Sequence, residues 1–144
     1  MNLESLQIQV TSGLTAATRQ WRRACESKLA DHGVSEACTR PLLAISRLGD
    51  GVRQVNVAQG CGLESASIVR LIDQLCDAKL VNRGRDGGDR RASLLSLTVT
   101  GRTLATAVEA ELARLRRHAL RGIEASDLEA TVRVITALRQ VMPE

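Results

Sequence analysis

The sequence has almost no aromatic residues: its 144 residues include no tyrosine and no phenylalanine, and Trp21 is the single tryptophan. A core must therefore be built from Leu, Ile, Val and Ala. Sandwiches and barrels of strands are enriched in aromatic and β-branched residues, so this composition favours packed helices. Hydrophobic residues make up 44% and charged residues 25% of the chain, as in ordinary globular domains, and long disorder is not expected.

Long apolar runs and paired cysteines are also missing. No stretch approaches the roughly 20 apolar residues of a membrane-spanning helix, and the first residues lack the basic start and apolar segment of a signal peptide. Cys25, Cys38, Cys61 and Cys76 are widely spaced without a C-x-x-C pair, which favours reduced thiols over a disulfide framework. We expect a cytoplasmic protein with no membrane partner.

Motifs of the common enzyme classes are absent as well. The chain contains no G-x-S-x-G, Walker loop, dinucleotide fingerprint or H-E-x-x-H. His32 and His118 are the only histidines, and they do not have the spacing of zinc ligands. We therefore predict that the protein is not an enzyme and that it uses no metal and no cofactor.

The positive charge is carried almost entirely by arginine. The net charge is +4, and Lys28 and Lys79 are the only lysines. A guanidinium offers several donors in one plane, which suits phosphates and the edges of bases. A genome rich in GC would also favour arginine, so this bias needs support from the arrangement of the chain.

Hydrophobic periodicity predicts a mainly helical chain. We expect a long helix over residues 3–31, a second from Ser35 to 48, a short one over 53–59 and a longer one over 64–78. Pro41 allows two interpretations of the second helix: it either kinks the helix, or lies in a first turn capped by Thr39. The pattern then predicts β-strands over 80–84 and 92–98, followed by a helix capped by Thr98 or Thr100.

The last third of the chain predicts two amphipathic helices. Apolar residues recur at steps of three and four from Leu104 to Ile123. Ser126, with Glu129 three residues later, resembles a capping box that opens a final helix. These helices are too apolar on one face for a small domain to cover, which favours a partner chain; folding back onto the same chain is the alternative.

Two features in the middle of the chain point to nucleic acid. The segment 52–63 followed by the helix 64–78 has the small residue Ala58 and the glycine Gly62 expected of a helix-turn-helix, although a helical hairpin in a bundle has a similar pattern. The hairpin after it bears arginines around a two-glycine tip, as a DNA-binding wing does. A solvated surface turn would also tolerate this run of charges.

Together these segments resemble the multiple-antibiotic-resistance regulator (MarR) family. The resemblance covers about residues 33–102 and is strongest over 86–92 and 95–102, which are similar to the family's wing and the helix start behind it. Residues 68–75 resemble its recognition helix, and residues 80–83 resemble the strand that enters the wing. The sequence departs from the family pattern at Val55, Cys61 and Lys79, the last standing where glycine commonly ends the recognition helix.

The resemblance implies a winged helix-turn-helix, mainly α with a small β-hairpin wing, in a single MarR-like domain over 1–144. The DNA-binding lobe is expected at 33–100, with dimerisation helices at 1–31 and 101–144. It further implies a homodimeric transcriptional regulator that binds a pseudo-palindromic operator in double-stranded DNA, by default a repressor released by a small-molecule effector. The expected DNA-binding residues are Gln54, Ser65, Ser67, Arg70, Arg83, Arg85, Asp89, Arg90 and Arg91. Among them, Arg91 would enter the minor groove, with Asp89 orienting it.

The sequence leaves several interpretations of the signal that would control the regulator. Trp21, Arg22 and His32 are candidates to line an effector pocket between the lobe and the dimer helices. Alternatively, Cys25 is a candidate redox thiol, because Arg22, Arg23 and Lys28 lie close in sequence and could lower its pKa. A third possibility is a winged-helix interaction module that does not bind DNA.

Overall fold

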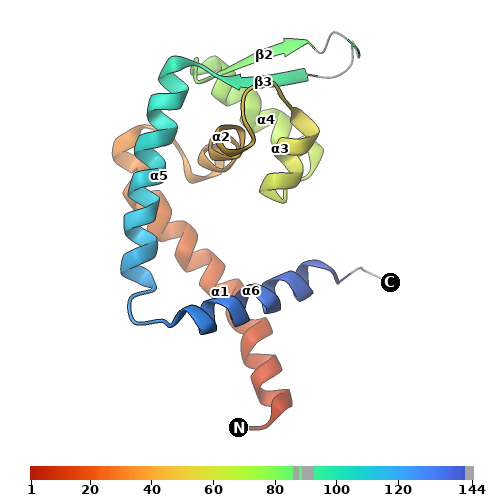
Figure 1. Ribbon diagram of the computed structural model, residues 1–144, viewed down its shortest axis with the longest axis vertical. Helices are drawn as coiled ribbons and strands as arrows, with labels where there is room; N and C mark the ends of the chain where they lie inside the picture. The colour runs from red at the N-terminus through yellow and green to blue at the C-terminus, as the bar shows by residue number, and fades with distance from the viewer. Residues whose placement is uncertain (86–87, 89–92, 142–144) are drawn as a thin grey trace. The chain divides into compact units, whose positions relative to one another are not determined.

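The computed structural model describes residues 1–85, 88 and 93–141 and divides into two compact units, Met1–Leu112 and Ala113–Glu144. In chain order the elements are α1 (Leu3–Leu29), the 3₁₀ helix η1 (Ala30–His32), α2 (Glu36–Leu48), β1 (Val52–Arg53), α3 (Gln54–Cys61), α4 (Ser65–Asp77), β2 (Val81–Arg85), β3 (Ser93–Leu97), α5 (Val99–Ala119) and α6 (Ala125–Arg139) (Figure 1). This mainly helical architecture with one small antiparallel sheet confirms the predicted fold class.

The start of α2 shows where Pro41 lies in the helix and which residue caps it. The helix begins after Ser35, whose hydroxyl accepts a hydrogen bond from the Cys38 N–H at 3.2 Å. Thr39 does not cap the helix; it is buried and its hydroxyl donates to the Ser35 carbonyl at 2.9 Å. Pro41 therefore lies in the second turn of α2, where the missing N–H costs the helix one hydrogen bond.

The core of the first unit lies where α2, α3 and α4 pack beside the sheet (Figure 1). The apolar face of α4 is buried through Ile68, Leu71, Ile72 and Leu75, and α5 adds Val108 and Leu112. Each buried aliphatic side chain stabilises the fold by roughly 1.5–3 kcal/mol. The fully buried large side chains are Leu29, Pro41, Leu42, Ile45, Val57, Ile68, Ile72, Leu75, Val81, Leu95 and Val108.

The sheet has a third strand that the sequence did not predict. Its order is β1-β3-β2, with β3 antiparallel to both neighbours. Val52 pairs with Leu95 and Arg53 pairs with Leu94. The prediction that Arg53 starts the short helix is wrong: Arg53 is a strand residue at the N-cap of α3, and the helix begins at Gln54.

The second unit contains the end of α5 and all of α6. The predicted capping box at Ser126 is wrong: α6 begins at Ala125 after Glu124, which is in extended conformation, and Ser126 is already helical. No residue of α6 within 125–139 is buried. The apolar side chains of Val132, Ile135 and Leu138 are thus exposed, at 60%, 41% and 37%.

Candidate nucleic-acid interface

The turn between α3 and α4 is built on glycine. α3 ends at Gly62, whose φ of 64° and ψ of 32° are left-handed values that glycine adopts without steric strain. The Leu63 N–H closes the turn by donating to the Ala58 carbonyl at 3.0 Å. Gly60 and Cys61 belong to α3, so the turn begins two residues later than we predicted.

One face of α4 is open to solvent while the other is buried in the core. Ser65, Ser67 and Arg70 are all exposed, and Ser67 and Arg70 share a face because they are three residues apart. In the part of the chain that the structure describes, no hydrogen bond or ion pair holds the Arg70 side chain. The helix therefore presents small polar groups and one unengaged guanidinium. Gln54 is half-buried at the start of α3.

The hairpin that follows α4 carries two of the predicted arginines on β2. Arg83 pairs with Leu95 and Arg85 with Ser93 across the sheet, and both arginines are exposed. The Arg83 guanidinium donates to the Asp73 carboxylate of α4 at 2.7 Å. The sequence prediction missed Asp73, because ten residues and a change of secondary structure separate it from Arg83.

The other predicted wing residues, Asp89, Arg90 and Arg91, lie outside the described residues. The described strands end at Arg85 and begin again at Ser93. The roles assigned to these three residues by resemblance thus stay predictions.

Below the hairpin, α5 starts in close contact with the segment that leaves α4. The Thr98 N–H donates to the Leu80 carbonyl at 3.0 Å, and the Thr98 hydroxyl donates to the Lys79 carbonyl at 2.8 Å. The same hydroxyl accepts from the Gly101 N–H at 2.9 Å. Of the two predicted caps, Thr98 and Thr100, it is therefore Thr98 that caps α5. Lys79 has a φ of 59°, which keeps the left-handed conformation expected of the glycine it replaces.

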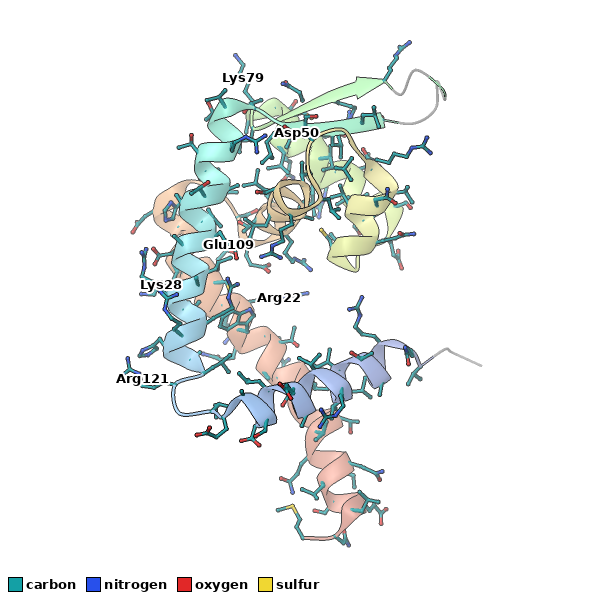
Figure 2. The ribbon with its side chains drawn as sticks, in the orientation of Figure 1. Arg22, Lys28, Asp50, Lys79, Glu109 and Arg121 are labelled. Carbon is teal, nitrogen blue, oxygen red and sulfur yellow. The ribbon has the colours of Figure 1, made fainter. Side chains whose placement is uncertain are left out.

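Two ion pairs join the end of α2 to one face of α5. Asp50 accepts from the Leu97 N–H at 3.1 Å and from Arg102 at 2.6 Å. Arg47 donates to Glu109 at 2.9 Å. Figure 2 labels Asp50 at the turn after α2 and Glu109 on α5. These pairs are exposed, so each contributes at most about 1 kcal/mol to stability.

The candidate effector residues lie along α1 and η1. Trp21 is 37% exposed and Arg22 is exposed, whereas His32 is half-buried in η1. Eleven residues of helix separate Trp21 from His32, or about 16 Å, so no compact ligand contacts both within one chain. Neither of two cavities in the described part of the chain is lined by these residues. One, of about 600 Å³, is an open groove along α5; the other, of about 270 Å³, lies between α2 and α3.

The cysteines are all free. A redox role for Cys25 required an exposed thiol, but the side chain is only 5% exposed. Cys38 is buried, and its thiol donates to the Gln74 side-chain oxygen at 3.1 Å. Cys61 and Cys76 are half-buried, and burial raises the pKa of both thiols. A raised pKa reduces the thiolate fraction on which peroxide sensing depends.

No helix within the described residues is long and apolar enough to cross a membrane. Within residues 1–85, 88 and 93–141, no cluster of three His, Cys, Asp or Glu side chains could hold a metal ion.

Comparison with known proteins identifies the family. A family model described as the MarR family matches residues 32–92, which span the helix-turn-helix and β2, the first strand of the hairpin. The crystal structure of the transcriptional regulator PA3341 is 30% identical in sequence and superposes with a TM-score of 0.78, covering 92% of this chain and 99% of that one. The chain belongs to the MarR family of transcriptional regulators.

Other solved structures share the fold of this MarR-family chain. CouR from Rhodococcus jostii RHA1, bound to p-coumaroyl-CoA, is 22% identical with a TM-score of 0.81, covering 94% of this chain and 95% of that one. MepR from S. aureus, in complex with DNA, is 16% identical with a TM-score of 0.82, covering 92% and 97%. Each match covers more than nine tenths of this chain, so the shared architecture extends beyond the helix-turn-helix and the hairpin.

Proposed function

We propose that this MarR-family protein is a homodimeric regulator that binds operator DNA through α4 and the wing, represses transcription, and is released by a small ligand. The observation that carries the proposal is the exposed face of α4. Ser65 and Ser67 leave room for close approach to a major groove, and Arg70 has a guanidinium free to reach a base or a phosphate. The similar protein MepR is described in complex with DNA, which supports this assignment.

The hairpin supplies the second contact surface of the proposal. Arg83 and Arg85 are exposed on β2, and the ion pair between Arg83 and Asp73 ties the hairpin to the helix that would read the major groove. Arg83 would then hold the two surfaces in a fixed relation, while the exposed Arg85 is available to the DNA backbone or the minor groove.

The direct test is a gel-shift titration against DNA flanking the protein's own gene, at two salt concentrations and with excess competitor DNA. A pseudo-palindromic operator with half-site centres about 10 bp apart is expected from a two-fold dimer. Binding that resists competitor supports the regulator. Binding no tighter than to random DNA, over all neighbouring intergenic regions, would instead favour an interaction module.

Substitution of Arg91 tests the wing. Arg91→Ala should weaken operator binding, and removing a phosphate contact should flatten the dependence of log K on log salt by about one unit per contact. The measurement is the operator affinity of the wild type and the variant across a salt series. Unchanged affinity would argue against a DNA-binding wing.

Uncovered apolar surface supports the dimer. On α1 the side chains of Leu3 and Ile8 are 71% and 58% exposed, although they belong to a stable helix. On α6 the apolar residues are exposed as well, and adjoining them are Leu120 and Ile123, at 44% and 49%. A set of this size on a single chain is typical of a surface that a partner covers.

A charge on α6 should break the dimer. Ile135→Glu buries a carboxylate if a second chain covers this face, so we expect a shift from about twice 15.5 kDa toward 15.5 kDa. Arg133→Glu places the same new carboxylate on the opposite face of α6 and should leave the mass unchanged. Sedimentation equilibrium measures both. A wild-type protein that is monomeric at micromolar concentration would contradict the dimer.

A further inference from the structure

The exposed face of α4 carries two apolar residues that the proposed function does not use. Ala66 is exposed, and Val69 is 43% exposed. They lie three residues apart and therefore share a helix face. Valine is also a poorer helix former than alanine, so an exposed valine here adds little to either the core or the helix. The residues that α4 does bury are Ile68, Leu71, Ile72 and Leu75.

Charged side chains border this apolar pair on α4. Arg70 follows Ala66 by four residues and is exposed, so its guanidinium is a neighbour of the pair on the helix surface. Asp73 follows Val69 by the same spacing. The Asp73 carboxylate accepts a hydrogen bond from Arg83 at 2.7 Å. The apolar surface is therefore confined to two small side chains beside a cation.

The size of the pair decides what can occupy it. A stable protein–protein interface buries roughly 800 Å² on each partner, far more than one alanine and one valine offer. A single methyl group needs no larger surface than this. The apolar group that base edges present in the major groove of double-stranded DNA is the C5 methyl of thymine. The neighbouring guanidinium favours the same polyanionic partner.

We propose that Ala66 and Val69 read a thymine in each operator half-site by packing against its C5 methyl. This inference rests on the proposed function, in which α4 lies in the major groove. Arg70, next to the pair, then contacts a nearby base pair or phosphate, so the two contacts together set the register of α4 on the DNA. The side chain of valine has one strongly preferred χ1 rotamer in a helix, so it meets the methyl at little cost in conformational entropy.

Replacing thymine with uracil in the operator tests the contact on the wild-type protein. Uracil lacks the C5 methyl but keeps the hydrogen-bonding groups of thymine, so the substitution removes the group that Ala66 and Val69 would cover. Loss of one buried methyl corresponds to roughly a fourfold loss of affinity, or roughly fifteenfold over the two half-sites of a dimer. Gel-shift titration, with uracil placed at each thymine of the half-sites in turn, should find this loss at one position. Equal binding with uracil at every position would overturn the proposal.

Two valine variants show whether Val69 is the residue that senses the methyl. Val69→Ser removes an exposed apolar side chain and should lose most of the preference for thymine over uracil. Val99→Ser is the matched control: Val99 begins α5 and is 86% exposed, and this variant should keep the full preference. Circular dichroism confirms that both variants are folded. A preference as strong in Val69→Ser as in the wild type would overturn the assignment.

5-Methylcytosine separates a methyl contact from an effect of DNA shape. At the thymine position found with uracil, a C·G pair should bind more weakly, and methylation of that cytosine should recover roughly fourfold in affinity per half-site. Equal affinity of the two cytosine operators would assign the uracil effect to DNA shape and overturn the contact. The proposal commits to thymine, which carries the methyl in unmodified DNA. A gain on cytosine methylation without any loss on uracil substitution would assign the site to methylated DNA instead.

The outcomes separate this inference from the proposed function. If the wild type binds its operator tightly and uracil has no effect, α4 reads DNA without this contact and the inference alone fails. If the wild type prefers no sequence over random DNA, the proposed function fails and the inference fails with it.

Discussion

Replacing Gly101 with alanine should destabilise the protein by roughly 3–5 kcal/mol, a large fraction of the roughly 5–15 kcal/mol by which native proteins are stable. A Cβ on Gly101 would collide with the Leu80 carbonyl oxygen and would lie 2.9 Å from the carbonyl carbon and 3.3 Å from the Leu80 Cα. All three atoms are backbone. The Leu80 carbonyl is also fixed by the hydrogen bond from Thr98, so relief requires α5 to move away from the segment that leaves α4.

This prediction reverses the usual sign of the substitution. Glycine within a helix is less favourable than alanine by about 1 kcal/mol, so sequence alone would suggest that Gly101→Ala stabilises α5. Gly60→Ala in α3 is the matched control: its Cβ makes only an ordinary contact at 3.9 Å, and we expect up to about 1 kcal/mol of stabilisation. Urea unfolding followed by circular dichroism, at one protein concentration, compares the three proteins. Equal stability of Gly101→Ala and wild type would disprove the close contact.

Replacing Arg70 with alanine should have the largest effect of any single described residue on operator recognition. A bidentate contact from arginine to guanine is worth about 1–3 kcal/mol, and a two-fold dimer would lose it twice. Affinity for the operator should then fall by about 30-fold to about 10⁴-fold. Stability should hardly change, because Arg70 is exposed and no described residue bonds its side chain.

The comparison with random DNA separates two roles for Arg70. If Arg70 reads a base, operator affinity falls much more than affinity for random DNA. If it contacts phosphate, both fall together and the salt dependence becomes shallower. Arg19→Ala, which removes an exposed arginine from α1, is the control and should change neither affinity. Full operator affinity in Arg70→Ala would exclude α4 as the reading helix in the orientation proposed here.

Long periodic segments were predictable from the sequence because their signal is local. The buried face of α4 and the capping of α2 by Ser35 follow directly from apolar spacing and side-chain chemistry. β1 was not predictable, since a strand of two residues has no periodicity and exists only through pairing with Leu94 and Leu95. The start of α6 was misplaced because Ser126 and Glu129 have capping chemistry, yet the helix begins before them.

The site was predictable in outline but not in its internal contacts. Spacing placed Ser67 and Arg70 on one helix face, and they are exposed as expected. The ion pairs of Asp73 with Arg83 and of Asp50 with Arg102 join residues ten and 52 positions apart, so only the fold brings them together. The burial of Cys25 is likewise a property of packing, since its basic neighbours in sequence say nothing about how the helix is covered.

The near absence of aromatic residues has a practical consequence for spectroscopy. Trp21 on α1 is the only tryptophan, and there is no tyrosine to contribute emission. Intrinsic fluorescence therefore reports on a single point in the protein. Unfolding of α2, α3 and α4 with α1 intact would change the tryptophan emission very little. Any event that covers or uncovers the middle of α1 would shift the wavelength of that emission. The protein thus carries a built-in optical label at one helix, and none in its winged lobe.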